Sequence, residues 1–441
     1  MNKNMFFIFL FTLISIISIL SDDISDNDLF DIPEEHLETV SQSKGQFTEE
    51  TASIYGYIVN FSNVELTFLE SEFNSSSFGN IFYLRLKGDW NPGKNLSFHS
   101  ELSYSANTGN QNLATLLGSN DLIQTLNIDH FWGTLNLWLL DFQFGKIPLA
   151  WGTGYVFNPT QKVSLVPFMD TVSEETPGTL GITSSLSLAD NLAIQGYVTF
   201  EDKSHKIYSI IEDSNWNNLP YGIKIQGILG AFDLSLSWIK EVSVPLQIIT
   251  QFPLVLSYTY NQSHYIGFDF AGAIWNFGIY GEAVVLIPQN TEEQLSFKDW
   301  DAKENIEACI GFDYSIPVLD IDIRTEYYHQ GQGENDKANY DITKLFTGEQ
   351  VILGEDYLFL YFEKVFLDYY KISSTGFINL NDGSFAIIPL LSYDMYSNFQ
   401  VELGSIVMFG PEGSEFNGEF SIPQKIDYTQ PSIFLRGKLS F

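Results

Sequence analysis

The chain has 441 residues, of which 15% are aromatic, and its 55 acidic residues against 21 basic ones give a formal charge of -34. This balance argues against a nucleic-acid partner, because neutralising phosphates requires clustered lysine and arginine. The single cysteine, Cys309, excludes an intramolecular disulfide and a cysteine-based metal cluster.

The first residues have the pattern of a secretory signal peptide. One basic residue, Lys3, precedes a mostly apolar run that ends at Leu20, and the small Ser21 follows. We expect residues 1–21 to be removed on export; the competing interpretation is an uncleaved anchor, but the apolar run is shorter than the roughly 20 residues of a spanning helix. No later stretch suits such a helix, so a mature chain in a membrane would cross it with strands.

An acidic extension follows the signal peptide. Residues 22–50 hold ten acidic residues and one lysine with few apolar side chains. This composition predicts a solvated, disordered periplasmic linker and not a folded domain. We therefore assign residues 51–441 to one folded domain.

From about Ser53 onward, apolar and polar residues alternate in segments of about ten residues, the pattern of strands with two different faces. In the last segment one face carries Ile433, Leu435, Leu439 and Phe441, and the other carries Ser432, Arg436, Lys438 and Ser440. Similar segments lie at 53–62, 79–89, 95–106, 126–136, 139–147, 179–189, 191–201, 219–229, 231–240, 263–273, 276–288, 306–315, 319–330, 355–363, 367–380, 383–392 and 396–409. About eighteen strands result, with sixteen possible because 63–78 and 250–262 are ambiguous.

The connections alternate in length. Short turns are predicted at 91–94, 189–191, 230–231, 275–276 and 317–318, and long connections at 107–125, 148–178, 202–218, 242–262, 289–305, 331–354 and 410–429. Outer-membrane barrels join their strands by short periplasmic turns and long outer loops. The alternation therefore favours a transmembrane, antiparallel, up-and-down β-barrel over the other all-β folds that the strands alone allow, namely a sandwich, a propeller or a β-helix.

Aromatic residues support the barrel. Pairs such as Tyr327/Tyr328 and Tyr369/Tyr370 fall near strand ends, where membrane barrels carry aromatic girdles. The terminal Phe441, preceded by alternating apolar residues, resembles the C-terminal signal that barrel-assembly machinery recognises. We expect an outer-membrane location, with lipid and this machinery as partners.

One local motif stands out at residues 145–160, GKIPLAWGTGYVFNPT. It resembles the G-(K/R)-Q-x-x-x-W-G-x-G-x-x-F-N-P segment of a large group of porin-like bacterial outer-membrane proteins. The matching positions are Gly145, Lys146, Trp151, Gly152, Gly154, Phe157, Asn158 and Pro159. Ile147 replaces the usual Gln, and Gln161 stands where an acidic residue often follows. The resemblance implies a porin-like barrel without naming a solute.

By strand count this motif opens the third outer loop, 148–178. In general porins that loop commonly folds into the lumen and narrows it, so the resemblance implies a constriction. Gly152 and Gly154 permit a sharp turn; the competing interpretation is a packed extracellular loop. The predicted constriction residues are Trp151, Gly152, Gly154, Phe157, Asn158, Glu174 and Glu175.

Charged residues on the polar face of the strands should line the lumen. Arg85 and Lys87 lie on the second strand, and Arg436 and Lys438 on the last. Across the ring, two adjacent strands carry Glu307, Asp313, Asp320, Asp322, Arg324 and Glu326. We expect either facing walls of opposite charge that set up a transverse field, or charges that pair with their neighbours.

Enzyme motifs are missing from the sequence. The six histidines occur singly, with no HExxH and no metal-ligand spacing, and there is no GxSxG or GxxxxGK[ST]. His99 and Glu101 share one strand face, which we interpret as structural. We expect no enzyme activity, no cofactor and no metal.

The sequence thus predicts a porin that passes small hydrophilic solutes by diffusion and prefers cations because of its acidity. The alternatives are a non-conducting adhesin or structural barrel and, less favoured, a hydrolase embedded in a barrel. The sequence leaves open several alternatives for the solute, a homo-oligomer or a monomer, and an open or a plugged lumen.

Overall fold

The structure is a computed structural model in which residues 51–69, 72–109, 123–163, 178–200, 219–243, 246–249, 255–258, 261–288, 302–341, 350–417, 419–421, 425–427 and 431–441 are described. The predicted signal peptide and acidic extension lie outside these ranges, as do Glu174 and Glu175. Within the described residues, no helix has the length and apolar character needed to cross a membrane.

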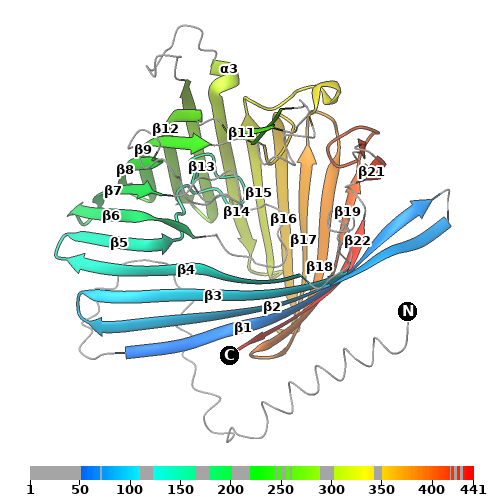
Figure 1. Cartoon of the computed structure of the whole chain (residues 1–441), viewed down its shortest axis with the longest axis horizontal. Helices are drawn as coiled ribbons and strands as arrows, with labels where there is room; N and C mark the ends of the chain where they lie inside the picture. Colours follow the sequence, from blue (N-terminus) through cyan, green and yellow to red (C-terminus); the bar gives the residue numbers. More distant parts are fainter. Residues whose placement is uncertain are drawn as a thin grey trace, which may run out of the picture. The chain divides into compact units, whose positions relative to one another are not determined.

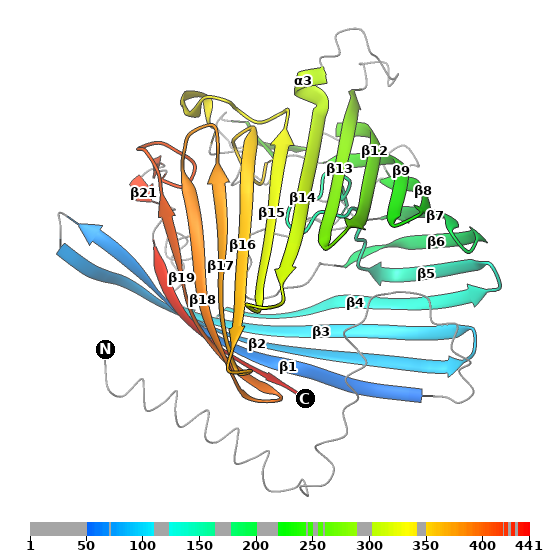
Figure 2. The ribbon, with the colours of Figure 1, turned by 180° about the vertical axis from the view of Figure 1, so that it is seen from behind.

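The described strands form one closed antiparallel sheet of eighteen strands, which confirms the predicted all-β barrel and its strand count. Each strand pairs with its predecessor along the barrel, and the last pairs with the first: Tyr57 lies opposite Ser440 and Glu65 opposite Ser432. Figures 1 and 2 show this sequential order as a continuous change of colour from blue to red.

The barrel strands are β1 (Thr51–Leu69), β2 (Glu72–Gly93), β3 (Leu96–Gly109), β4 (Ile123–Leu137), β5 (Leu140–Ile147), β6 (Thr179–Ala189), β7 (Leu192–Thr199), β8 (Tyr221–Leu229), β9 (Phe232–Ser243), β12 (Asn261–Ile274), β13 (Phe277–Pro288), β14 (Ile306–Ile316), β15 (Ile321–Gln330), β16 (Asp356–Phe366), β17 (Tyr370–Asn379), β18 (Phe385–Tyr396), β19 (Phe399–Phe409) and β22 (Ser432–Ser440).

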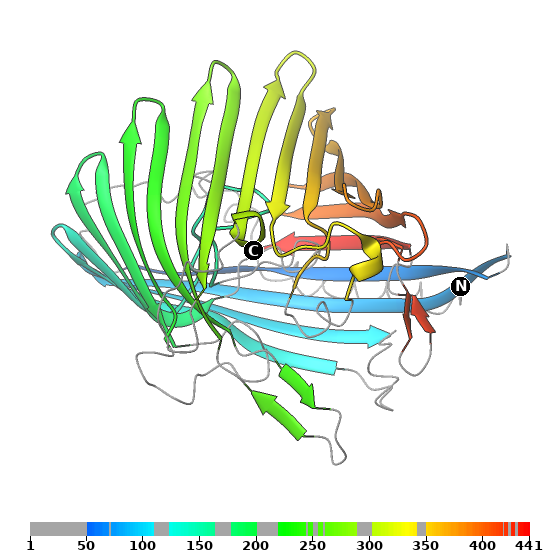
Figure 3. The same ribbon diagram turned by 90° about the horizontal axis from the view of Figure 1, so that it is seen from above.

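The remaining elements belong to the long connections. Two hairpins, β10 (Leu246–Ile249) with β11 (Val255–Tyr258) and β20 (Glu419–Ser421) with β21 (Lys425–Asp427), form sheets separate from the barrel. Figure 3 shows both hairpins, in green and red, standing apart from the wall. A helical turn α3 (Ala302–Asn305) and a 3-10 turn η3 (Lys337–Asn339) complete the described elements. The ambiguous segments therefore add no barrel strand, because the described residues of 63–78 belong to β1 and β2 and those of 250–262 belong to β11 and the start of β12.

The predicted asymmetry of the connections is present. Tight turns join β2 to β3, β4 to β5, β6 to β7, β8 to β9, β12 to β13, β14 to β15, β16 to β17 and β18 to β19. Several of these turns place an apolar residue in the left-handed region, including Trp138 with φ 56° and Trp275 with φ 55°. Asp320, predicted on a strand, lies in such a turn with φ 50°, so its prediction as a wall residue was wrong.

The two faces of the wall differ as the alternation predicted. On β14, Ile310 and Phe312 are 55% and 43% exposed, whereas Cys309, next to Ile310, is 4% exposed. On β15 the buried Glu326 has the exposed Tyr327 beside it. The outer face is therefore apolar and exposed, which suits lipid, and the inner face is polar and buried. The other charged residues predicted to line the lumen occupy the alternate positions that face inward on their strands: Arg85, Lys87, Glu307, Asp313, Asp322, Arg324, Glu326, Arg436 and Lys438.

Candidate functional site: a segment fixed to the inner wall

The segment that follows β5 lies against the inner face of the barrel. In Figures 1 and 2 its teal trace lies beside β13 and β14 and does not prolong the β5–β6 hairpin. Ile147 and Leu149 pack with Tyr197 of β7 in one buried cluster, and the Trp151 ring meets Tyr197 at 4.7 Å. The Lys224 ammonium lies 5.2 Å from the centre of the Trp151 ring. Trp151 therefore fixes the start of the segment to β7 and β8.

Glu282 of β13 holds the middle of the segment. Its Oε1 accepts hydrogen bonds from the backbone N–H of Thr153 at 3.1 Å and of Gly154 at 2.8 Å. Its Oε2 accepts from the backbone N–H of Thr160 at 2.9 Å and from the Thr160 hydroxyl. Hydrogen bonds to a charged acceptor contribute about 1.5–3 kcal/mol each. One carboxylate thus pins both ends of the turn between residues 153 and 160.

Glu326 of β15 holds the tip in the same way. Its carboxylate accepts from the backbone N–H groups of Tyr155, of Val156 at 3.0 Å and of Phe157 at 3.1 Å. The Tyr280 hydroxyl donates to the same carboxylate at 2.8 Å. Glu326 has no exposed surface. Five consecutive backbone N–H groups, 153–157, are therefore satisfied by two wall carboxylates in place of secondary structure.

The glycines of the motif are required by this close approach. Gly152 has φ +106°, and a Cβ there would lie 2.7 Å from Oε2 of Glu282. A Cβ on Gly154 would lie 1.9 Å from the carbonyl oxygen of Phe157. The Asn158 carbonyl accepts from the Gln161 N–H at 3.0 Å across a turn with proline at its second position. These residue types bend the chain back onto the wall.

Aromatic packing completes the attachment. The Phe157 ring stacks on Tyr328 at 4.5 Å with an interplanar angle of 7°. The Tyr155 ring lies 5.8 Å from Phe359, and the Arg324 guanidinium carbon lies 3.9 Å from the centre of the Tyr155 ring. Arg324 thus contacts an aromatic ring of the segment.

An ion pair closes the described part of the segment. Lys162 Nζ lies 2.6 Å from Oε2 of Glu307, which also accepts from the Tyr328 hydroxyl at 3.4 Å. Two of the acids predicted to line the lumen, Glu307 and Glu326, therefore bind the inward-folded segment. Asp313 and Asp322 lie on the inner face nearer the tight turns, where the Ser315 hydroxyl donates to Asp322.

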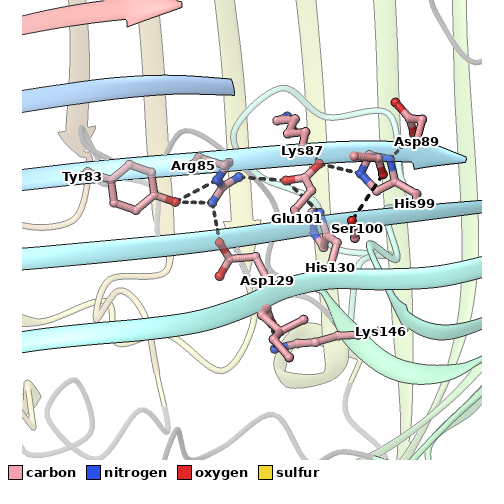
Figure 4. Close-up of polar contacts among 12 residues, drawn as sticks. Tyr83, Arg85, Lys87, Asp89, His99, Ser100, Glu101, Asp129, His130 and Lys146 are labelled. Atoms are coloured by element: carbon pink, nitrogen blue, oxygen red, sulfur yellow. Dashed lines mark hydrogen bonds and ion pairs between the residues drawn. The ribbon is translucent and has the colours of Figure 1, made fainter. Parts of the chain in front are cut away.

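Three of the predicted basic residues, Arg85, Lys87 and Arg436, are paired with acids of nearby strands. Arg85 lies 3.3 Å from Glu101 and 3.1 Å from Asp129, and Lys87 lies 3.4 Å from Glu101. Figure 4 shows this cluster on β2, β3 and β4. Near the closure, Arg436 donates to Glu402 of β19, and Lys438 lies 4.8 Å from the centre of the Tyr57 ring. This is the neighbour pairing that the sequence left open, and it reduces any transverse field from these side chains.

Sequence reasoning missed two groups of residues. Glu282 was not singled out, although it is the one charged residue in the otherwise uncharged β13 sequence FGIYGEAVVLIP. A lone acid on the inner face of an apolar strand is a usable signal, because an isolated buried charge requires partners. The second group is His99, Glu101 and His130: the sequence analysis placed the first two on one face and interpreted them as structural, and the strand register adds His130.

A separate cluster joins the long connections. Glu415, in the connection after β19, accepts from the backbone N–H of Leu353 at 3.0 Å, from Asn379 Nδ2 at 2.7 Å and from the Tyr357 hydroxyl. The Glu415 backbone N–H donates to Asp382 at 2.8 Å. Burial raises the pKa of the Glu415 carboxyl above its ordinary value, despite these donors. We call Leu353, Tyr357, Asn379, Asp382 and Glu415 the loop cluster.

No protein-family model matches the chain, and no curated protein matches it. Among solved structures, it is similar to a mutant porin of Rh. blastica, with 10% identity and a TM-score of 0.42 over 89% of this chain and 100% of that one. OccK5 (OpdH) of Pseudomonas aeruginosa gives 8% identity and a TM-score of 0.49 over 88% and 98% of the two chains. OmpT, an outer membrane protein of Vibrio cholerae, gives 10% and 0.40 over 89% and 99%. The barrel assignment rests on the strand pairing itself.

Proposed function

We propose that this protein is an outer-membrane diffusion pore in which loop 148–178 forms the constriction. The observation that carries the proposal is the attachment of residues 153–160 to the inner wall by Glu282 and Glu326. A loop that lay only on the extracellular surface would not require two buried carboxylates on strands more than 120 residues away in sequence. Small hydrophilic solutes are the proposed cargo, because the inner face is polar and a pore admits what its lining can solvate.

Cation preference is part of the proposal. The chain carries a formal charge of -34, and Arg85, Lys87 and Arg436 are paired with acids. Unbalanced acid around a lumen attracts cations and repels anions. The apolar outer face supports contact with membrane lipid, and the terminal Phe441, whose N–H and C=O pair with Gly56, supports recognition by assembly machinery. We propose export through a cleaved signal peptide and no hydrolase activity.

The test is single-channel recording of the refolded barrel in a planar bilayer, with the reversal potential measured under a KCl gradient. Stable conductance steps and a cation-selective potential are expected. Folded barrels that never conduct would exclude the pore function and favour the adhesin or structural role.

The constriction is tested by Gly154→Ala. A methyl group cannot fit against the Phe157 carbonyl, so the segment must leave the wall and the conductance should change, with a loss of stability of about 2–3 kcal/mol. Gly93→Ala is the matched control, because a Cβ there has no atom within 4 Å. Equal conductance of both variants and the wild type would contradict the assignment of this loop.

A further inference from the structure

Three potential metal ligands meet on the inner wall where β3 and β4 pair (Figure 4). His99 and Glu101 are two residues apart on β3 and so share the inner face, and His130 of β4 lies directly opposite Glu101. One ligand atom from each of the three side chains can be chosen so that all lie within 4.8 Å of one another. The spacing in sequence gave no indication of this group because the third member comes from the neighbouring strand.

A β-bulge creates the arrangement. The register between β3 and β4 shifts between Glu101 and Leu102, which leaves Asp129 between the paired residues Ile128 and His130. Two successive side chains of β4 can therefore act on the same face: Asp129 bonds to Arg85 at 3.1 Å, and His130 Nδ1 lies 3.2 Å from Glu101. Bulges re-aim side chains in this way and are enriched beside functional sites.

The distances suit a small divalent ion. His99 Nε2 lies 2.9 Å from Oε1 of Glu101, and His130 Nδ1 lies 3.2 Å from Oε2 of the same carboxylate. Bonds of about 2.1 Å from zinc to nitrogen or oxygen place tetrahedral ligands about 3.4 Å apart. The three side chains need only small movements to reach this geometry. Two imidazoles and one carboxylate are a donor set that zinc and other late transition metals prefer.

A second, independent observation concerns the outer partner of His99. Its Nδ1 lies 2.6 Å from Oδ1 of Asp89, so this carboxylate orients the ring with Nε2 facing Glu101. Ligating histidines almost always have such a carboxylate or carbonyl partner on the other ring nitrogen. The Trp132 ring, 4.1 Å from the His99 ring, limits its rotation. Orientation of this kind is what a metal site requires.

We propose that His99, Glu101 and His130 bind one divalent transition-metal ion, with Zn²⁺ as the reference ion, and that Asp89 positions His99. Three protein ligands leave a fourth coordination position for water or a solute. The site is distinct from the Glu282 and Glu326 attachment and does not depend on conduction.

Neighbouring charges determine how strongly such an ion competes with Arg85 and Lys87 for the Glu101 carboxylate. Arg85 and Lys87 both contact Glu101, while Asp89 and Asp129 add two further carboxylates. Three carboxylates against two cations leave this group acidic when both imidazoles are neutral. An entering ion therefore weakens the contacts of Glu101 with Arg85 and Lys87 and replaces their charge.

The experiment is calorimetric titration of Zn²⁺ into the full chain folded in detergent micelles. One ion per chain is expected, with affinity reduced by more than about tenfold in His99→Gln and His130→Gln, and by about tenfold in Asp89→Asn. His264→Gln is the control, because His264 is also a buried histidine of the barrel, on β12, but lies outside the group. Its affinity should equal that of the wild type.

A measurement on the wild type alone guards against variants that fail to fold. X-ray absorption at the zinc edge should show two imidazole ligands and oxygen at about 2.0–2.1 Å. The proposal is overturned if no stoichiometric binding occurs, if the folded His99 and His130 variants bind as the wild type does, or if the spectrum contains no imidazole. Because binding is measured without a bilayer, failure here leaves the conductance test unaffected, and the reverse also holds.

Discussion

Two sectors of the inner wall use carboxylates in different ways. On β13 and β15, Glu282 and Glu326 accept hydrogen bonds from the backbone of a segment folded inward after β5. On β3 and β19, Glu101 and Glu402 face the cations of Arg85 and Arg436. The first sector fixes the position of a loop, and the second balances charge within the wall. The comparison teaches that charge alone does not show which residues shape the lumen; the partner of each charge does.

The largest expected effect comes from removing both loop anchors, Glu282→Ala with Glu326→Ala. Without their acceptors, at least five backbone N–H groups of the segment lose partners at a buried site, and we expect a loss of about 4–6 kcal/mol in the free energy of unfolding. Urea unfolding in micelles measures this loss, and single-channel recording should show a higher conductance as the segment leaves the wall.

Glu363→Ala is the control for this double variant. Glu363 shares the inner face but contacts only Lys371, at 3.4 Å, and the Tyr361 hydroxyl among the described residues. Its removal should cost less than about 1 kcal/mol, because the Lys371 side chain is about a third exposed. Comparable losses in both experiments would show that the loop anchors have no special role, and the contrast between the two sectors would disappear.

A smaller effect is expected from breaking the ion pair of the second sector. Arg436→Gln leaves the buried Glu402 carboxylate with the Ser392 hydroxyl, at 3.2 Å, and should cost about 3 kcal/mol. Adding Glu402→Gln should recover part of that loss, because no uncompensated charge remains. Equilibrium unfolding of the two single variants and the double variant measures the coupling. Conductance should stay near that of the wild type; a change as large as that of the loop anchors would contradict the division into sectors.

The smallest effect concerns the loop cluster and depends on pH. Burial raises the pKa of Glu415 in the folded protein, so the protonated carboxyl is favoured there. Its contribution to stability is full below the ordinary pKa of 4.5 and is lost as the pH rises through the folded pKa. Relative to Glu415→Gln, the wild type should therefore lose stability between acidic and neutral pH. Thermal unfolding of both proteins across that range tests this, and a difference that does not vary with pH would exclude it.

Several features of the barrel could be predicted because they depend on residues that are close together in the sequence. Alternation on β22 separated Ile433 and Leu435 from Arg436 and Lys438, and the structure places these pairs on opposite faces. The turns predicted at 230–231 and 275–276 are confirmed, because β9 and β13 begin directly after them. Trp138 and Trp275 occupy left-handed turn positions where glycine or asparagine would be the ordinary signal. Asp320 was misplaced for the same reason, since its turn lacks a glycine.

The sequence by itself determined the strand count, the two faces of the wall and the sharp turn around Gly152 and Gly154, because each depends on residues close together in the chain. Only the tertiary structure decided which charges meet. Glu326 contacts the tip at Tyr155 across 171 residues, and His130 reaches Glu101 only through a bulge in the register. A buried charge must find a partner, but alternation along a strand specifies the face and not the partner. Barrel closure supplies that missing information by fixing which strands and connections lie together.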